Sequence, residues 1–424
     1  MNVRRRAFLN TAGCIAAASL GCALRTAPAT ERPAARVVVV GGGYGGCTVA
    51  RYLRIIAPRL HVTLIDRETH HESCPGSNEV LGGIRAPGSL RQSRWRLAAV
   101  DGVHLVRGEV QQIDRSRREV VLRTGARIAY DRLILSPGIA LRWDAIAGYD
   151  RAASLKVPHA WQGGDQVALL RRQLQAMRPG GTAIIVVPAN PYRCPPGPYE
   201  RASLFAYYLK RRNPRAKILI IDAKTQFSKQ ALFLQGWRDL YPGMIDWLPH
   251  SAEGAVERVD AERRVVYTEF GEHRADVLNV IPPQRAADLA SACELVDESG
   301  WCPVDPVSFE STRHPGIHVI GDACIASPMP KSAFAANSQA KACAAAVAAL
   351  LDGHTPARPS LINHCFSFLN PDYAISVTGV YAYSATAGAL VANATGETPP
   401  DGDRSAEARY ARAWQRQFAR DVFG

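Results

Sequence analysis

Three cysteines stand in segments where a thiol could carry out redox chemistry. Cys194 lies in a proline-rich turn after the apolar, β-branched segment 184–187, Cys365 lies far along the chain, and Cys74 lies in a polar loop. Thiolates are nucleophiles, and a cysteine pair can exchange with an incoming sulfur nucleophile through disulfide chemistry. The elements around these thiols determine which electron acceptor they can reach.

The turn that holds Cys194 stands where a nucleotide-binding unit usually carries a glycine-rich phosphate loop. The strand before it, an expected helix from Tyr199 to Arg212 and a further strand over 217–222 have the order of such a unit. The turn itself contains prolines and one cysteine instead of the glycine fingerprint. We therefore interpret this unit as a nucleotide fold rebuilt around a reactive thiol, and we do not expect it to bind NAD(P)H.

The N-terminal part carries the complete signature of a dinucleotide site. A four-valine strand leads into Gly41, Gly43 and Gly46, at a spacing that allows a sharp turn, close approach of a pyrophosphate and close packing of a helix on the sheet. The helix N-terminus then offers free N–H groups to the phosphates. About 20 residues on, a second strand ends in Asp66, the acid expected to bind the adenosine ribose.

Two later segments favour FAD over NAD as the dinucleotide. The segment ending in Pro137 and Gly138 resembles the strand-to-glycine connection that closes the FAD domain of flavoproteins with two dinucleotide folds. The segment ending in Asp322 resembles their second FAD motif, in which the aspartate bonds the ribityl chain. The backbone of Val110 is expected to contact the adenine.

An alanine-rich helix is expected from Ser332 to Leu351, with its N-terminus at the flavin pyrimidine ring. Negative charge on the reduced flavin would be stabilised there by the helix dipole, with Lys331 and Ser332 as cofactor-binding residues. A solvated lysine at a helix start is the alternative for Lys331.

Together these segments predict an α/β fold with two dinucleotide-binding-fold domains of the glutathione-reductase type plus a C-terminal interface domain. The helix that ends the chain has an apolar stripe of Trp414, Phe418 and Phe423, which suits packing rather than membrane insertion. The expected parts are an export signal (1–29), a discontinuous FAD-binding domain (30–149 and 275–354), the NAD(P)H-domain-like unit with Cys194 (150–274) and a C-terminal domain with Cys365 (355–424).

The N-terminus has the pattern of an export signal. Three arginines, Arg4 to Arg6, precede a short apolar stretch and a small-residue exit at Ala27-Pro28-Ala29. The arginines followed by Phe-Leu resemble a twin-arginine signal, the route for proteins that fold around a cofactor before export. We therefore expect a periplasmic protein in an oxidising compartment that permits disulfides. No apolar run reaches the roughly 18 residues of a membrane span, so none is expected.

The basic charge and the cysteine spacing limit the partners. The net charge is +13, but lysine and arginine are scattered, which predicts a solvated basic surface or a face for an acidic protein rather than for nucleic acid. The sequence has no Cys-x-x-Cys-His, so any c-type haem belongs to a partner. His70 and His71 lack further ligands at useful spacing, so no metal site is expected.

The sequence around the three cysteines leaves several roles open. Cys74 can be a stray thiol, a disulfide partner or a covalent attachment point for flavin. Cys194 and Cys365 lie in segments expected to converge on the flavin ring, where a disulfide can accept a nucleophile and pass two electrons to the ring. A plain stabilising disulfide is the alternative. Glu200, at the start of the helix after Cys194, is either a proton handler or a complement to the helix dipole.

Several motifs together resemble one family, the flavoprotein subunit of flavocytochrome c sulfide dehydrogenase. The similarity extends over essentially the whole chain. The motifs are Arg193-Cys-Pro-Pro-Gly-Pro-Tyr-Glu, Phe227-Ser-Lys-Gln, Ile281-Pro-Pro-Gln-Arg, Gly300-Trp-Cys-Pro-Val-Asp, Gly321-Asp-Ala-Cys and Pro328-Met-Pro-Lys-Ser.

This resemblance implies an activity and roles for the three cysteines. Cys74 would bind FAD covalently through the 8α carbon, and Cys194 and Cys365 would form the redox disulfide. Hydrosulfide would attack that disulfide, electrons would enter the flavin, and a c-type cytochrome subunit with haem c would accept them as the partner in a heterodimer. A low pKa of the released thiolate, next to the flavin and a helix N-terminus, is expected to favour the transfer of electrons to the ring. The surroundings of Cys74, including Pro75, depart from the aromatic-rich pattern of the family. The alternative to a covalent link is a loop that the proline alters, with FAD bound but not bonded.

Two other functions fit parts of the same pattern. A sulfide:quinone reductase shares the fold and the disulfide but should carry an exposed apolar C-terminal anchor. A non-catalytic flavin-binding partner in a sulfur-oxidising complex would bind FAD without reducing it. A pyridine-nucleotide disulfide reductase is disfavoured because the second glycine fingerprint and a Cys-x4-Cys motif are missing.

Overall fold

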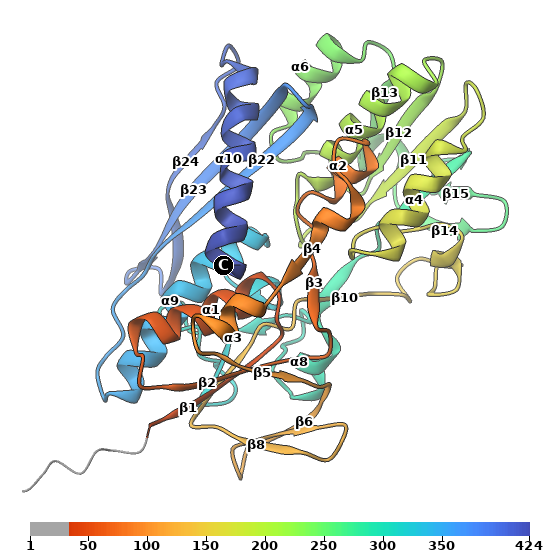
Figure 1. Ribbon diagram of the computed structural model, residues 1–424. Helices are drawn as coiled ribbons and strands as arrows, with labels where there is room; N and C mark the ends of the chain where they lie inside the picture. Colours follow the sequence, from red (N-terminus) through yellow and green to blue (C-terminus); the bar gives the residue numbers. More distant parts are fainter. Residues whose placement is uncertain (1–33) are drawn as a thin grey trace, which may run out of the picture. The chain divides into compact units, whose positions relative to one another are not determined.

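The computed structural model describes residues 34–424, and the expected export signal over 1–29 lies outside this range. The first sheet is parallel and has the order β20-β9-β1-β2-β5. Its strands β1, β2 and β5 are labelled in Figure 1. Val37 to Val40 of the central strand are almost fully buried, as expected for a parallel strand covered on both faces. These strands are β1 (Arg36–Val40), β2 (His61–Asp66), β5 (His104–Arg107), β9 (Arg132–Leu135) and β20 (Ile317–Val319).

Two helices from distant parts of the chain pack together on this sheet. They are α1 (Tyr44–Ile56) and α9 (Ala333–Leu351), and α9 confirms the helix predicted to end at Leu351. Alanine side chains let α9 approach its neighbours closely, and α9 also contacts β22. In the described part of the chain, α9 is the one helix long and apolar enough to cross a membrane, but 61% of it is buried inside the protein, as in a core helix.

The second sheet is also parallel, with the order β13-β12-β11-β17. The predicted order of strand, turn, helix and strand is confirmed as β11 (Thr182–Val187), α5 (Gly197–Arg212) and β12 (Lys217–Asp222). One boundary is corrected. The unit was expected to end at residue 274, but β17 (Val277–Val280) pairs with β11, so the chain completes this sheet before returning to the first one. The fourth strand is β13 (Ile245–Leu248).

The C-terminal part is an antiparallel sheet of three long strands, β22 (Ser360–Asn370), β23 (Tyr373–Ser384) and β24 (Ala389–Glu397). Helix α10 (Arg404–Phe423) contacts β23 and runs beside this sheet in Figure 1. The packing role predicted for its apolar stripe is confirmed. Trp414 and Phe418 pack against Phe334 of α9, and Phe418 and Phe423 contact Tyr44 of α1.

Smaller elements connect these layers. Two antiparallel three-stranded sheets are β6 (Val110–Asp114), β7 (Glu119–Leu122), β8 (Arg127–Ala129) and β14 (Val256–Asp260), β15 (Val265–Thr268), β16 (Glu272–Arg274). Three two-stranded sheets are β3 (His70–Glu72) with β4 (Arg91–Ser93), β10 (Ile139–Leu141) with β18 (Gln284–Ala286) and β19 (Cys302–Pro303) with β21 (Cys324–Ile325). The other helices are α2 (Ser77–Leu81), α3 (Trp95–Ala99), α4 (Asp165–Gln175), α6 (Gln230–Leu240), α7 (His250–Glu253), α8 (Asp288–Ala292) and the 3₁₀ turns Pro87–Leu90, Ala153–Leu155 and Gly321–Ala323.

Candidate active site

The glycine loop between β1 and α1 contains two kinds of glycine. Some positions have no room for a side chain within the protein, and one leaves space for a ligand. A Cβ at Gly46 would lie 1.7 Å from the carbonyl oxygen of Gly41, and a Cβ at Gly41 would lie 2.3 Å from that of Ser136. A Cβ at Gly43 would meet nothing nearer than the His71 ring, at 3.5 Å. The face of the loop at Gly43 is therefore open for the approach of a pyrophosphate.

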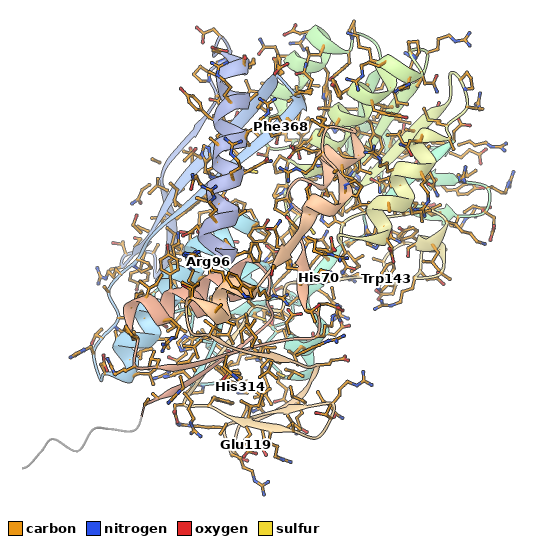
Figure 2. The ribbon with its side chains drawn as sticks, in the orientation of Figure 1. His70, Arg96, Glu119, Trp143, His314 and Phe368 are labelled. Atoms are coloured by element: carbon orange, nitrogen blue, oxygen red, sulfur yellow. The ribbon has the colours of Figure 1, made fainter. Side chains whose placement is uncertain are left out.

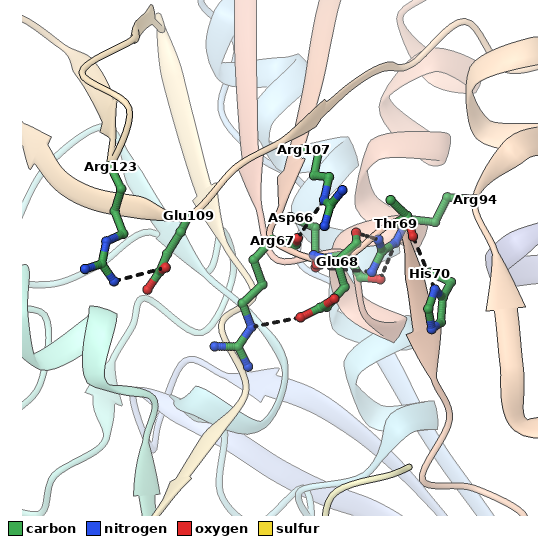
Figure 3. A network of polar contacts seen from close by, with 10 residues as sticks. Asp66, Arg67, Glu68, Thr69, His70, Arg94, Arg107, Glu109 and Arg123 are labelled. Atoms are coloured by element: carbon green, nitrogen blue, oxygen red, sulfur yellow. Dashed lines mark hydrogen bonds and ion pairs between the residues drawn. The ribbon is translucent and has the colours of Figure 1, made fainter. Parts of the chain in front are cut away.

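Asp66 stands at the end of β2, beside this loop. Its carboxylate accepts the Gly42 backbone N–H at 2.5 Å, and Nη2 of the buried Arg94 lies 3.2 Å from the same oxygen (Figure 3). A carboxylate has lone pairs left for ribose hydroxyls after these contacts. Val110 begins β6 shortly after Arg107, the β5 residue that pairs with Asp66, so the chain reaches Val110 directly from the strand beside Asp66. Arg94 was not predicted.

The residues expected nearer the flavin ring include an acceptor that lacks a donor. Oδ1 of Asp322 is buried and has no hydrogen-bond partner within the described chain, while its Oδ2 lies 3.9 Å from Nη1 of Arg193. Burial raises the pKa of Asp322, and Arg193 and Lys331 oppose this shift. Pro137 and Gly138 follow β9, and no atom lies within 4 Å of a Cβ built at Gly138. A buried acceptor without a donor suits a hydroxyl of a chain such as ribityl.

Lys331 and Ser332 are held by the protein at the start of α9. The ammonium of Lys331 donates to the carbonyls of Asp322 at 2.9 Å and Cys324 at 2.8 Å, and it lies 3.8 Å from the centre of the Trp301 ring. The alternative of a solvated lysine therefore does not hold, and burial lowers the pKa of this ammonium. The Ser332 hydroxyl accepts the Ala335 N–H at 2.9 Å and caps the helix. That leaves the first N–H groups of α9 as its free donors.

Cys74 stands at the first position of a tight turn whose sequence explains its shape. The Ser77 N–H donates to the Cys74 carbonyl at 3.0 Å, and Gly76 has φ 88° and ψ −7°. Proline followed by a glycine with positive φ is the pattern of a type II turn. Pro75, which departs from the family pattern, thus favours the turn that holds Cys74 in place.

The Cys194 turn is fixed by bonds at each step. The Cys194 N–H donates to the Lys331 carbonyl at 2.8 Å, and its carbonyl accepts the Gly197 N–H at 2.9 Å. Cys194 has φ 58°, a left-handed conformation that is uncommon for a residue with a side chain and that often marks a functional site. A Cβ at Gly197 would lie 3.0 Å from the Cys194 sulfur, so the thiol lies against the first turn of α5.

Cys365 comes to the same place from the C-terminal sheet, because β22 packs on α5. The Lys229 ammonium, which is buried, lies 3.4 Å from the Cys365 carbonyl and donates to the Ser367 hydroxyl at 2.8 Å. The Glu200 carboxylate accepts the backbone N–H of Phe368, labelled in Figure 2, at 2.9 Å and the Asn78 amide at 2.8 Å. The structure thus brings two thiols, one carboxyl group and one ammonium group together.

The electrostatics of this group correct one expectation. Burial raises the pKa of Cys194, and the charges of Cys365 and Glu200 raise it further, while Arg193 and Lys229 oppose them. Burial likewise raises the pKa of Cys365 and Glu200, and it lowers the pKa of Lys229. The low thiolate pKa predicted from the helix N-terminus is therefore wrong, because desolvation outweighs the nearby cations.

All eight cysteines within residues 34–424 are free thiols in this structure. The predicted pairing of Cys194 with Cys365 therefore stays a prediction that rests on their placement. Among the same residues, no group of three or more His, Cys, Asp or Glu side chains could hold a metal ion.

A buried arginine behind the Cys194 turn links the segments of the site. Arg201 donates to Asn78, to Asn279 and to the carbonyls of His159 and Ala160, at 2.6–3.1 Å. It has no carboxylate among these partners, and burial lowers its pKa to about 10. Sequence reasoning did not single out Arg201, Arg193 or Lys229, although Arg193 adjoins Cys194 and Lys229 lies in the Phe227-Ser-Lys-Gln motif.

We expect the buried histidine in this network to make the protein less stable in acid. Burial and the nearby Arg201 charge lower the pKa of His159 to about 3, and its Nδ1 accepts the Trp161 N–H at 2.9 Å. Its pKa in the unfolded chain is about 6.5, so the unfolded state binds more protons as the pH falls below that value. Linkage gives a loss of about 2 kcal/mol from this group between pH 7 and pH 5.

Urea unfolding at the two pH values measures this loss. In His159→Asn, an amide oxygen can replace the Nδ1 acceptor without titrating, so the difference in unfolding free energy between pH 7 and pH 5 should shrink by about 2 kcal/mol. If this pH difference in unfolding free energy is unchanged in the variant, His159 does not cause the loss of stability in acid.

Three family models match successive parts of the chain. Residues 35–173 match Pyridine nucleotide-disulphide oxidoreductase, residues 167–282 match Sulfide dehydrogenase (flavocytochrome c) flavoprotein chain, central, and residues 357–423 match Flavocytochrome c sulphide dehydrogenase, flavin-binding. A sulfide dehydrogenase (flavocytochrome c) flavoprotein chain from Chlorobaculum thiosulfatiphilum is 53% identical over 45 residues, which are 11% of this chain and 94% of that sequence. The chain belongs to the flavocytochrome c sulfide dehydrogenase flavoprotein family. It is therefore a flavoprotein of a sulfide-oxidising family, as the motifs around Cys194 predicted.

More distant relatives share the architecture. The mitochondrial sulfide:quinone oxidoreductase of Mus musculus is 23% identical over 327 residues, covering 72% of this chain and 68% of that protein. The solved structure of the sulfide:quinone oxidoreductase from Aquifex aeolicus superposes with a TM-score of 0.71 at 18% identity, covering 92% of each chain. The structure of putidaredoxin reductase in its covalent complex with putidaredoxin gives a TM-score of 0.63 at 19% identity, covering 90% of this chain and 92% of the other. These structures confirm the predicted α/β class with two dinucleotide folds and a C-terminal domain.

Proposed function

We propose that this flavoprotein oxidises hydrogen sulfide to zero-valent sulfur or polysulfide through a Cys194–Cys365 disulfide and FAD, and passes the electrons to a c-type cytochrome subunit. The observation that carries the proposal is the convergence of these two cysteines from separate parts of the fold around the buried Lys229 and Glu200. Plain stabilisation of the fold would not require an ammonium and a carboxyl group beside the thiols.

The chemistry at the thiols balances without a metal. Hydrosulfide attacks one sulfur of the disulfide, the S–S bond breaks, and a persulfide forms on one cysteine while the other leaves as a thiolate. A second sulfide then attacks the outer sulfur of the persulfide. The two sulfide-derived sulfurs leave together as hydrogen disulfide, and both cysteines are left reduced. The positive charges of Lys229 and Arg193 favour the thiolate that burial disfavours.

FAD, when bound, supplies the acceptor for the two electrons of the cysteine pair. The open face at Gly43, Asp66 and the unpartnered oxygen of Asp322 would hold its pyrophosphate, ribose and ribityl groups. The start of α9, with Lys331 beside it, would oppose the negative charge of the reduced ring. We propose a covalent link of the flavin to Cys74 and haem c on the partner subunit, in a periplasmic heterodimer exported by the twin-arginine route.

The electron acceptor distinguishes this proposal from a sulfide:quinone reductase, which the 23% identical relatives favour. We expect the sulfide-reduced protein to reduce a soluble c-type cytochrome at least about 10-fold faster than a water-soluble quinone, because two of the matching family models are those of a flavocytochrome c flavoprotein chain. Stopped-flow absorbance of the flavin and the haem measures both rates. Faster oxidation by the quinone would favour the quinone reductase.

A flavin-binding protein without catalysis is the remaining alternative. Anaerobic titration with sulfide tests it, because an active protein loses its oxidised-flavin absorbance with about two sulfides per flavin, one that forms the persulfide and one that releases it. A wild-type protein that stays yellow while denaturation shows intact flavin would favour the non-catalytic function.

A further inference from the structure

One guanidinium group is directed at the sulfur of Cys74. Nη2 of Arg193 lies 3.3 Å from the Cys74 Sγ and also donates to the Trp161 carbonyl, which accepts the Cys74 thiol at 3.7 Å. Nη1 of the same side chain lies 3.9 Å from the Asp322 carboxylate. Arg193 thus contacts the predicted attachment residue directly and approaches the predicted ribityl ligand.

Both partners of this contact are held in place by other bonds. The Arg193 backbone N–H donates to the Gln284 side chain at 2.9 Å, and the guanidinium side chain is only 19% exposed. Cys74 is fixed by the type II turn through Gly76. Because the guanidinium also donates to the Trp161 carbonyl and the backbone of Cys74 is held by its turn, Nη2 of Arg193 is kept beside the sulfur.

The guanidinium of Arg193 lies nearer to the Cys74 sulfur than to any carboxylate. Its Nη2 is 3.3 Å from the sulfur, while the ion pair of its Nη1 with Asp322 spans 3.9 Å, beyond hydrogen-bond distance. The other buried cation nearby, Arg201, gives all of its hydrogen bonds to Asn78, Asn279 and two carbonyls, and none to a sulfur. Arg193 is therefore the cation placed to act on Cys74.

We propose that Arg193 is the catalytic residue for covalent attachment of FAD to Cys74, because its guanidinium stabilises the thiolate that forms the new bond. The proposal rests on the covalent link under the proposed function. The Cys74 sulfur bonds to the flavin methyl carbon, a C–H bond of that methyl group and the S–H bond break, and the flavin gains the two electrons and two hydrogens. The acceptor cytochrome then reoxidises it, so no further oxidant is needed.

The experiment follows covalent attachment itself rather than turnover. Full-length apoprotein from riboflavin-limited cells is mixed with FAD, and the flavin that stays with the acid-precipitated chain is measured against time. In Arg193→Met attachment should be about 10–100-fold slower, because the sulfur loses the guanidinium that contacts it. Arg193→Lys keeps the charge but not the planar guanidinium, so its attachment rate should lie between those of wild type and Arg193→Met. Cys74→Ala is the control that retains no flavin.

A pH series separates a catalytic from a structural role. Because the thiolate is the reacting form, a more alkaline buffer should restore attachment in Arg193→Met towards the wild-type rate. Attachment at the wild-type rate in Arg193→Met, or slow attachment that higher pH does not restore, would overturn the proposal. If the wild-type chain releases all of its flavin in acid, the covalent link under the proposed function fails first. If wild type holds its flavin covalently and Arg193→Met attaches FAD at the same rate, the role of Arg193 is refuted while the covalent link stands.

Discussion

Replacing Cys194 by serine is expected to lower the rate of flavin reduction by sulfide by about 10³-fold or more, the size of effect seen when a covalent nucleophile is removed. A serine hydroxyl cannot form the disulfide that accepts hydrosulfide, while its similar size preserves the turn that the Lys331 carbonyl and the Gly197 N–H hold in place. Anaerobic stopped-flow absorbance of the flavin measures the rate.

The matched variants test whether the effect belongs to the pair. Cys365→Ser should show a loss as large as that of Cys194→Ser, because the disulfide needs both sulfurs. Cys293→Ser should remain close to wild type, since this buried cysteine ends α8 and its neighbours are Arg115 and Glu294 rather than the thiols of the site. Sulfide-dependent bleaching at an undiminished rate in Cys194→Ser would contradict the proposed function.

Replacing Gly46 by alanine is expected to disrupt the first sheet, and replacing Gly43 by alanine is expected to affect only the cofactor. At Gly46 the new Cβ would lie 1.7 Å from a backbone oxygen, so the helix must move, at a cost of about 3 kcal/mol or more. At Gly43 the new Cβ meets only a ring carbon at 3.5 Å, so the apoprotein should change by less than about 0.5 kcal/mol.

Urea unfolding of the apoproteins and FAD titration of the same samples separate the two effects. In a Cys74→Ala background, which removes the proposed covalent link, the FAD Kd of Gly43→Ala should rise about 10–100-fold, because the methyl group blocks the pyrophosphate. An unchanged Kd for Gly43→Ala would show that the pyrophosphate does not approach this face of the loop.

The parts of the fold that depend on local pattern were predictable from the sequence. The valines of β1, the glycines after it and Asp66 depend on residues close in sequence and on the geometry of one unit. The alanine-rich α9 and the apolar stripe of α10 follow from helical periodicity.

The features that the sequence did not reveal depend on burial and on contacts between distant segments. Lys229 is an ordinary lysine in the sequence, and only the packing of β22 on α5 shows that its ammonium is buried beside Cys365. The low pKa predicted for the thiolate failed for the same reason, since a helix N-terminus is visible in a sequence but desolvation is not.

The domain boundary predicted at residue 274 was wrong because a parallel strand can be added to a sheet from any later part of the chain. β17 joins the second sheet beside β11, and four apolar or amide residues give no sign of which sheet they enter. Arg193 is part of the motif around Cys194, but its contact with Cys74 depends on two turns that are distant in sequence and meet in the fold.

The oxidation state of Cys194 and Cys365 is the most direct test of the proposed redox disulfide. The purified protein is alkylated before and after one equivalent of sulfide under anaerobic conditions, digested without reduction, and examined by mass spectrometry. We predict a cross-linked peptide pair containing Cys194 and Cys365 before sulfide is added, and a persulfide on one of them with the other alkylated afterwards. Full alkylation of both cysteines before sulfide is added, in a protein whose flavin sulfide still bleaches, would contradict this prediction.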